Sequence, residues 1–269
     1  MEVIIKTAEE IESIRQSSLL VGDTLAEVAA AIRPGIRTIE LDTIAETFIR
    51  DYKADPAFKG YNGFPGSLCI SVNAEVVHGI PGNRELKDGD VVSVDCGVKM
   101  NGFFGDSAYT FVVGESSEMV RKLIVVTKEC LLRGIASAKS GNRTGDIGSS
   151  VQDYAESNGF SVVRELVGHG VGKRLHEKPE VPNYGKKGSG TLLRDGMVIA
   201  IEPMINAGKR NIIQLDDGWT IVTADKLPAA HFEHTVAIKQ GKADVLSTFE
   251  KIEKAENNNN NLSKPQLEN

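Results

Sequence analysis

One arrangement of helices occurs twice in this chain of 269 residues. In the first copy, a long helix is predicted to begin at Thr7-Ala8-Glu9-Glu10, which has the form of a capping box, and to end before Arg33-Pro34-Gly35. A shorter helix is predicted over about 38–52. In the second copy, a long helix over about 118–138 precedes a short one over about 144–156. Any fold for this chain must therefore accommodate two similar helical pairs.

The segments that join the helices of each pair are also alike. Gly35-Ile36-Arg37-Thr38 and Gly141-Asn142-Arg143-Thr144 agree at three of four positions and lie 106 residues apart. With the repeated helix order, this favours two related halves, over about 8–113 and 117–240, which pack face to face with a site between them. The alternative is two unrelated helical pairs that share a short helix-start sequence.

Strands are predicted after each helical pair. Residues 90–98 alternate between the two faces of a strand, Asn101-Gly102 is a strong hairpin signal, and residues 103–113 return along the first strand. In the second half, residues 197–201 and 232–238 are predicted strands. Each half should therefore combine helices with antiparallel strands.

Two acidic residues lie on the apolar strands of the predicted hairpin. If its turn is centred on Asn101-Gly102, Asp95 pairs with Ala108. Asp106 then lies on the same face, diagonally opposite Asp95. Two carboxylates directed at one point repel each other unless a cation or a proton lies between them. A metal site is one interpretation, and the alternative is that one acid points inward while the other is solvated.

The second half supplies comparable residues. Glu202 closes the predicted strand 197–201, and Glu233 lies in the predicted strand 232–238. Glu202 follows Asp95 by 107 residues, which is close to the repeat distance, so these two positions are candidates for equivalence. Either glutamate alone is more typical of a rim residue than of a metal ligand. Four acids on the strands of two related halves make a shared site the stronger interpretation.

Histidines in glycine-rich segments extend the candidate site. They are His78, His169 and His176, of which His169 lies in Gly168-His169-Gly170-Val171-Gly172. Lys173 stands where the third glycine of a dinucleotide-binding loop would be, so this segment does not predict nucleotide binding.

Charge and cysteine content limit the function classes. The chain has 31 Lys and Arg residues against 37 Asp and Glu residues and a net charge of −6, which does not favour a specific nucleic-acid partner. Cys69, Cys96 and Cys130 form no Cys-x-x-Cys pair, so we expect a reducing, cytoplasmic location and no disulfide framework. Neither a signal peptide nor an apolar run long enough to span a membrane is predicted.

Seven motifs occur in a characteristic order: His78-Gly79-Ile80-Pro81, Asp95-Cys96-Gly97, Gly105-Asp106, Gly168-His169-Gly170-Val171-Gly172, His176-Glu177, Ile201-Glu202-Pro203 and Glu233-His234-Thr235. On these motifs the chain resembles the type I methionine aminopeptidases over about residues 4–240. The resemblance implies the α/β (α+β) pita-bread fold, in which two pseudo-symmetric halves form a central antiparallel sheet with outer helices.

The resemblance also implies a dinuclear metal centre. Asp95 would bind one metal through both oxygens, and Asp106 and Glu233 would bridge both metals. His169 and Glu202 would complete the ligands of the second metal. Four carboxylates balance the charge of two divalent ions, and this oxygen-rich set suits manganese, iron or cobalt, with zinc as a further candidate.

By the same resemblance, the chain is a metalloaminopeptidase that removes the N-terminal methionine from nascent proteins and peptides with a small second residue. A water or hydroxide that bridges the two metals would attack the methionine carbonyl, with Glu202 as the general base. His176 would donate a hydrogen bond to the scissile carbonyl oxygen, and His78 would contact the substrate near the scissile nitrogen.

The methionine side chain requires an apolar pocket. The residues that match the family's pocket positions are Tyr61, Phe64, Cys69 and Trp219. Ordinary core packing is the alternative for all four. Phe58 and Leu175 differ from the residues that are frequent at their positions, and both are candidates for reshaping the pocket entrance. His231 has no required counterpart and is expected to be incidental.

Two other function classes stay open on the sequence. One is a proline-specific aminopeptidase or prolidase of the same fold, and the other is a non-catalytic relative that binds peptides or ribosomes. For the preferred function, the expected partners are the N-termini of nascent polypeptides, with the ribosome as a further candidate. A membrane partner is not expected, and the expected state is a monomer.

The end of the chain differs in composition from the rest. Residues 1–249 are expected to form a single catalytic domain, whereas residues 250–269 are polar and rich in asparagine. Such a segment has little apolar surface to bury, so it is predicted to be disordered. Removal of residues 257–269 is therefore expected to leave folding intact.

Overall fold

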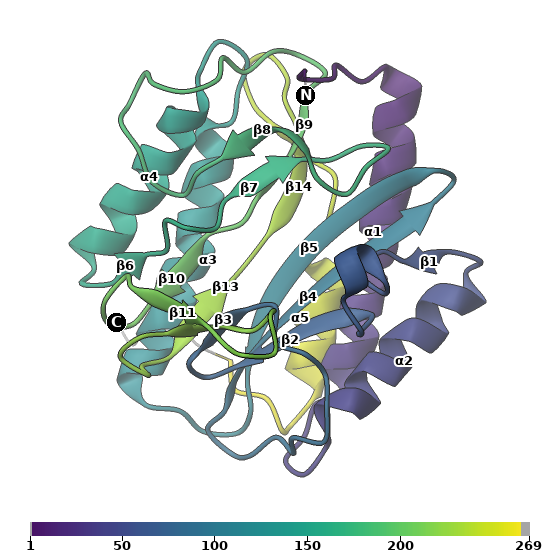
Figure 1. Cartoon of the computed structure of the whole chain (residues 1–269), viewed down its shortest axis with the longest axis vertical. Coiled ribbons are helices and arrows are strands. Elements are labelled where there is room, and N and C mark those ends of the chain that lie inside the picture. The colour runs from purple at the N-terminus through teal and green to yellow at the C-terminus, as the bar shows by residue number, and fades with distance from the viewer. Residues whose placement is uncertain (1, 265–269) are drawn as a thin grey trace.

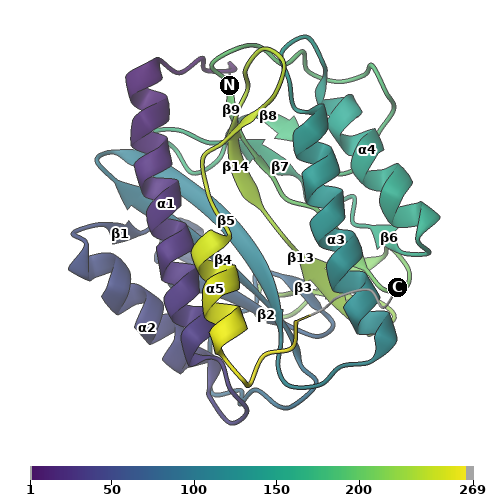
Figure 2. The same cartoon turned by 180° about the vertical axis from the view of Figure 1, so that it is seen from behind.

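Both predicted helical pairs are present in the structure, a computed structural model that describes residues 2–264. They are α1 (Ala8–Ala31), α2 (Thr38–Asp51), α3 (Glu118–Ser137) and α4 (Thr144–Ser157). The capping box of α1 is formed, because Thr7 and Glu10 exchange side-chain-to-backbone hydrogen bonds of 3.1 and 3.3 Å. The two opposite views in Figures 1 and 2 show α1 and α3 covering the same face of the strands. None of the helices within residues 2–264 has the length and apolar character needed to cross a membrane.

The central strands of the two halves have similar surroundings. The first half contains β1 (Asp55–Pro56), a 3-10 helix η1 (Tyr61–Gly63), β2 (Leu68–Val72), β3 (Glu75–Val77), β4 (Val91–Met100) and β5 (Phe103–Val112). The second contains β6 (Ser161–Val162), β7 (Gly168–Gly170), β8 (Glu177–Val181), β9 (Val198–Ile201), β10 (Met204–Asn206), β11 (Ile212–Gln214), β12 (Ile221–Thr223), β13 (Ala229–His231), β14 (His234–Ala237) and β15 (Asp244–Val245). β4 pairs with β1, β2 and β5, and β9 pairs with β7 and β14, always antiparallel.

The β4–β5 hairpin has the register predicted from its turn. Asp95 pairs with Ala108, so Asp106 lies diagonally opposite Asp95 on the same face. The turn residues Asn101 and Gly102 have φ angles of 52° and 82°, the left-handed values that a two-residue hairpin turn of this kind requires. Local turn chemistry is therefore sufficient to aim both carboxylates at one point.

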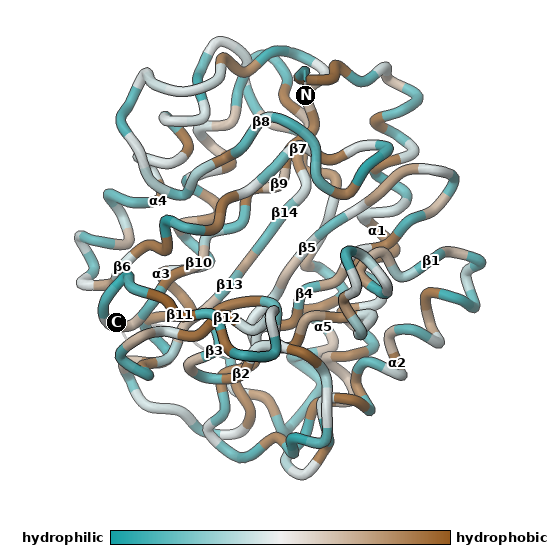
Figure 3. The backbone as a smooth tube through the Cα atoms, in the orientation of Figure 1, coloured by the Kyte–Doolittle hydropathy of each residue, from teal (hydrophilic) through white to brown (hydrophobic). Residues whose placement is uncertain are grey.

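The repeated joining segments make the same contacts in their own halves. Residues 35–38 exchange backbone hydrogen bonds with residues 84–86, and residues 141–144 exchange the matching bonds with residues 191–193. The prediction of two pseudo-symmetric halves is confirmed by this duplicated pattern. Hydrophobic stretches in Figure 3 lie on several strands, for example near β2 and β6, whereas β14 and many of the peripheral loops are more hydrophilic.

The pairing of the joining segments reveals a second sequence repeat, which was not predicted. Leu86-Lys87-Asp88-Gly89 and Leu193-Arg194-Asp195-Gly196 lie 107 residues apart, and they lead into β4 and β9 respectively. The same distance separates Asp95 from Glu202. These two acids are therefore equivalent positions of the two halves.

The predicted strand 232–238 is wrong in one respect, because it is interrupted. Phe232 and Glu233 separate β13 from β14, just as Glu202 and Pro203 separate β9 from β10. β13 pairs with β10 and β14 with β9 in one continuous register, so the two interruptions lie opposite each other. Proline has no N–H to donate, and the ladder therefore opens at this level. The opening leaves both glutamates at the junction between two sheets.

The predicted disorder of the tail is wrong for residues 250–264. Helix α5 (Glu250–Asn258) packs along α1 (Figure 2), with the Ile252 side chain fully buried. Leu262 is 6% exposed, and the Asn259 amide donates hydrogen bonds of 2.8 and 2.7 Å to carbonyls at the end of α1. A few apolar residues at helical spacing suffice for docking, because the asparagine satisfies helix-end carbonyls that otherwise have no partner. Residues 265–269 lie outside the described residues.

We therefore expect Leu262→Ala to lower the free energy of unfolding by about 2–3 kcal/mol, because it removes a buried side chain from the tail. Asn260→Ala is the matched control, since Asn260 is exposed and lies two residues away. Urea denaturation of both variants measures the effect. Equal stability of Leu262→Ala and the unsubstituted protein would show that the tail is not docked in solution.

Candidate active site

A cavity of about 260 Å³ lies where the two halves meet, and it is lined by every residue predicted for the site. These residues are Asp95, Asp106, His169, Glu202, Glu233, His78, His176, Tyr61, Phe64, Cys69 and Trp219. Phe58 and Leu175 also line it. The structure thus brings together side chains that lie as far apart in the sequence as positions 58 and 233.

The polar floor of the cavity is built from the central strands. β4 and β5 supply Asp95 and Asp106, and the two opposed interruptions supply Glu202 and Glu233. His169 lies among them, with its Nε2 atom 3.5 Å from Glu202 Oε1 and 3.8 Å from Asp106 Oδ2. Ligand atoms of Asp106, His169 and Glu233 all lie within 4.8 Å of one another.

Glycines on either side of His169 permit this placement. A Cβ atom at Gly168 would lie 2.4 Å from the Ala200 carbonyl oxygen, and one at Gly170 would lie 2.4 Å from that of Lys178. The Nδ1 atom of His169 lies 3.0 Å from the Gly170 carbonyl oxygen. Because this contact occupies Nδ1, the Nε2 lone pair faces the carboxylates.

Burial dominates the electrostatics of the floor. It raises the pKa of Asp95 to about 7 and that of Glu202 to about 8. Burial and the neighbouring carboxylates also raise the pKa values of Asp106 and Glu233 well above the ordinary range. For His169, burial lowers the pKa to about 3. Without a cation, the floor therefore holds protonated carboxyl groups around a neutral imidazole.

Three carboxylate oxygens show that this floor fits metal ions. Asp95 Oδ1, Asp106 Oδ1 and Glu233 Oε1 are buried and have no hydrogen-bond partner among the described residues. A buried oxygen without a partner is costly, and a coordinated cation satisfies it. Four carboxylates also match the charge of two divalent ions. The donor set of this floor therefore suits divalent metals.

His78 lines the cavity from a strained turn. Its φ angle of 59° is in the left-handed region, which is uncommon for residues other than glycine. A Cβ atom at Gly79 would lie 2.2 Å from the Ile70 carbonyl oxygen, so only glycine fits there. The Gly79 N–H donates to Ser71 Oγ (3.1 Å), and burial lowers the pKa of His78 to about 4. A neutral His78 is thus held at the cavity wall.

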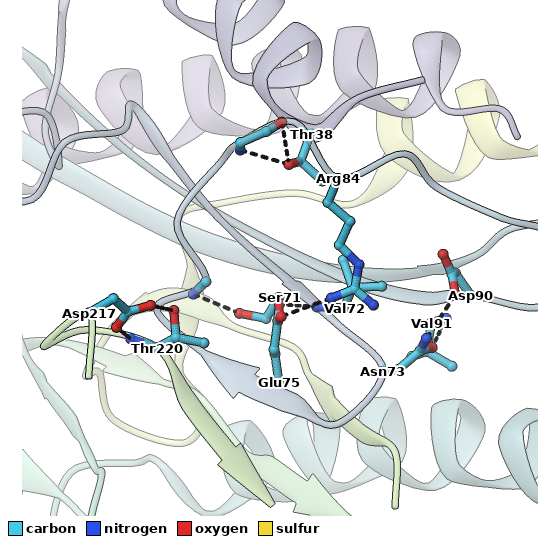
Figure 4. A network of polar contacts seen from close by, with 12 residues as sticks. Thr38, Ser71, Val72, Asn73, Glu75, Arg84, Asp90, Val91, Asp217 and Thr220 are labelled. Atoms are coloured by element: carbon cyan, nitrogen blue, oxygen red, sulfur yellow. Dashed lines mark hydrogen bonds and ion pairs between the residues drawn. The ribbon is translucent and has the colours of Figure 1, made fainter. Parts of the chain in front are cut away.

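A polar network surrounds this turn and the neighbouring loop that carries Trp219 (Figure 4). Glu75 accepts hydrogen bonds from the Val72 N–H and from the Arg84 guanidinium, each of 2.8 Å. Asp217 accepts from the backbone N–H groups of Trp219 and Thr220, each at 2.8 Å. These bonds fix the two loops from outside the cavity.

The apolar wall of the cavity adjoins the carboxylates. Phe58, Phe64, Cys69 and Leu175 form one buried cluster, and Trp219 packs against it. The Trp219 and Phe64 rings meet edge to face at 5.1 Å between centroids. Phe58 requires a glycine beside it, since a Cβ atom at Gly97 would lie 2.6 Å from its ring. This wall can hold an unbranched apolar side chain next to the polar floor.

The exposed residue His176 also lines the cavity, and an ion pair of the next residue holds its backbone in place. The next residue, Glu177, forms a buried ion pair with Lys6, with Nζ and Oε2 2.8 Å apart and both side chains at most 3% exposed. Glu177 also accepts from the Arg174 N–H (3.2 Å). No local sequence pattern predicts this ion pair, because its members lie 171 residues apart.

The prediction that His231 is incidental is wrong. It is 1% exposed, and its Nε2 atom lies 3.7 Å from Glu202 Oε2 and has no hydrogen-bond partner among the described residues. The only sequence signal was its place two residues before Glu233. It is part of the surroundings of the floor and not an incidental residue.

Comparison with known proteins assigns the chain to a family. Residues 12–240 match the metallopeptidase family M24. The chain is 53% identical over 245 residues to a methionine aminopeptidase of Clostridium perfringens, and the match covers 91% of this chain and 98% of that protein. It is 52% identical to methionine aminopeptidase 1 of Bacillus subtilis, with coverage of 91% and 99%.

Solved structures agree with this assignment. The methionine aminopeptidase of Thermotoga maritima has a TM-score of 0.90 and 44% identity, over 92% of this chain and all of that one. The prolidase of Pyrococcus furiosus has a TM-score of 0.73 and 26% identity, over 91% of this chain but 65% of its own. Both share the pita-bread fold with this chain. The chain therefore belongs to metallopeptidase family M24 and, within it, to the methionine aminopeptidases.

Proposed function

We propose that this protein hydrolyses the N-terminal methionine from nascent proteins and peptides with a small second residue, with the help of two divalent metal ions. The observation that carries the proposal is the apolar wall directly beside a floor of four carboxylates and His169. Such a cavity offers a methionine side chain a place to bind while its carbonyl group would lie near the residues that would hold the metals. The names of its relatives support the same activity.

All the residues that the resemblance implies as metal ligands line the floor of the cavity. Asp95, Asp106, His169, Glu202 and Glu233 would together hold the two metal ions. Manganese, iron or cobalt suits this oxygen-rich set, and zinc is a further candidate. Divalent ions held there would lower the pKa of a coordinated water toward neutrality and so supply the nucleophile.

Side chains of the protein would transfer the proton, stabilise the carbonyl oxygen and bind the substrate. Glu202 would take the proton from the attacking water, since its carboxylate lies at the junction of the two sheets beside His169. His176 would donate a hydrogen bond to the carbonyl oxygen as negative charge develops on it. His78 would contact the substrate near the scissile nitrogen, and Tyr61, Phe64, Cys69 and Trp219 would hold the methionine side chain.

The two halves would act together as a catalytic unit. We propose that this unit comprises halves of about 8–113 and 117–240, because each half contributes two of the four carboxylates, and that it extends through the docked helix α5. We place its action in the cytoplasm, which the three free, buried cysteines support. As the partner that presents nascent N-termini we propose the ribosome, and as the working state a monomer.

We expect peptides that begin Met-Ala, Met-Gly or Met-Ser to be cleaved, and those with Lys, Glu or Leu second to resist cleavage. The reason is steric, because the second side chain would meet the protein wall beside the metals. Activity on Met-Ala-Ser and on an Xaa-Pro peptide, with added manganese and after chelation, tests the proposal. Faster cleavage of the Xaa-Pro peptide, or full activity after exhaustive chelation, would refute it.

Metal removal should also change how stability depends on pH. Asp95 and Glu202 have folded pKa values of about 7 and 8, above their unfolded values near 4, so the metal-free folded state keeps protons that the unfolded state loses. The buried histidines have the opposite effect on the pH dependence of stability, but only below about pH 6.5. At higher pH they are neutral in both the folded and the unfolded state. The free energy of unfolding of the metal-free protein should therefore fall between about pH 6.5 and 8.

Bound metal should reverse this loss by mass action, by roughly 2.7 kcal/mol at a hundredfold excess over its Kd. Thermal melts from pH 6.5 to 8, with manganese and with chelator, measure both effects. A chelated protein that melts as the metal-loaded one does, or gains stability over this range, would contradict the assignment of the floor as a metal site.

Replacement of His176 and replacement of His169 should impair the enzyme in different ways. His176→Ala is expected to keep its metal, to show a near-normal KM and to lose about 10²–10³-fold in kcat, because its hydrogen bond matters most when charge develops. His169→Ala should instead lose metal affinity. Metal analysis and steady-state kinetics of both variants provide the comparison. An empty metal site in His176→Ala would mean that the two roles are wrongly assigned.

A further inference from the structure

We infer that Tyr61 is a positioning residue for His176: its hydroxyl group donates a hydrogen bond to Nδ1 and so keeps the imidazole proton on Nε2, the nitrogen that would serve the substrate. The inference rests on the proposed role of His176 as donor to the scissile carbonyl. It gives Tyr61 a task beyond the methionine pocket.

The contact itself is short and well placed. The Tyr61 hydroxyl oxygen lies 2.7 Å from His176 Nδ1, and the two ring centroids are 5.2 Å apart. The His176 ring also meets the His169 ring edge to face, with 4.2 Å between the ring centroids. His176 therefore contacts the Tyr61 hydroxyl group through Nδ1 and also packs against a residue of the metal floor.

The direction of the hydrogen bond follows from acidity. A phenol is a stronger acid than a neutral imidazole N–H, and an imidazole nitrogen lone pair is a better acceptor than a phenol oxygen. Burial raises the pKa of Tyr61, so its hydroxyl keeps its proton. A neutral imidazole carries one N–H, and an Nδ1 atom that accepts therefore leaves the proton on Nε2.

Both partners are held in place by their own backbones. The Tyr61 N–H donates to the Phe58 carbonyl and the Phe64 N–H donates to the Tyr61 carbonyl, each at 2.9 Å. Beyond His176, the buried Lys6–Glu177 ion pair fixes the chain. The freedom left to His176 is a flip of its ring or a change of tautomer, and the Tyr61 hydrogen bond disfavours both.

The consequence for the reaction is specific. An Nε2–H group can donate to an oxygen that gains negative charge, whereas an Nε2 lone pair repels that oxygen. Loss of the Tyr61 hydroxyl should therefore act on the transition state more than on substrate binding. A residue that served only as a wall for the methionine side chain would change KM instead.

Kinetics of Tyr61→Phe, which removes the hydroxyl and keeps the ring, test this point. We expect kcat to fall about fivefold with KM within twofold of normal, as the loss of one neutral hydrogen bond implies. In a His176→Ala background the same substitution should have no further effect, because the two residues act as one unit. Tyr52→Phe is the matched control, since Tyr52 is exposed on the surface. Additive losses in the double variant, or an effect confined to KM, would overturn the inference.

Nitrogen-15 NMR of the five histidines gives a readout independent of activity. In protein loaded with diamagnetic Zn²⁺, the His176 signals, identified by their loss in His176→Ala, should show a protonated Nε2 and an unprotonated Nδ1. In Tyr61→Phe the two shifts should move toward each other, because a protonated ring nitrogen resonates far upfield of an unprotonated one. Unchanged shifts would overturn the inference. If methionyl peptides were not cleaved at all, the proposed function would fail while the NMR result would still decide the tautomer.

Discussion

The burial of four carboxylates at the contact between two halves is the constraint on which the rest of this structure depends. Bringing Asp95, Asp106, Glu202 and Glu233 to one point is unfavourable unless protons or cations lie among them. Each carboxylate comes from a different strand or strand junction, so the site exists only when both halves are folded and docked. Metal binding and the folded state are consequently linked.

The scaffold meets this constraint with rigid local geometry. The two-residue turn of the β4–β5 hairpin sets the register that aims the first two carboxylates, and opposed interruptions in the second half aim the other two. Glycines at 79, 168 and 170 let backbone segments approach where a Cβ atom would collide. The floor is therefore held by backbone hydrogen bonds, which leaves its carboxylate oxygens free for metals.

The outer parts of the chain stabilise the same site from a distance. Lys6 reaches across to Glu177 and thereby anchors the segment that carries His176. The tail helix packs along α1, and Leu262 pairs with Val113 just after β5, so the tail supports the first half. Residues near both ends of the described chain therefore make contacts with the halves that form the cavity.

The sequence by itself determined the repeated halves and the hairpin register, because turn chemistry and apolar spacing are local properties, and its motifs resemble a family whose implied site residues all line the cavity. It did not reveal the Lys6–Glu177 ion pair, the contact of Tyr61 with His176 or the place of His231 beside Glu202. Those contacts depend on which segments come together after the halves dock, and no local sequence pattern predicts them. The tail shows the same limit: its polar composition predicted disorder, yet Ile252, Asn259 and Leu262 find partners on surfaces that only the folded protein provides.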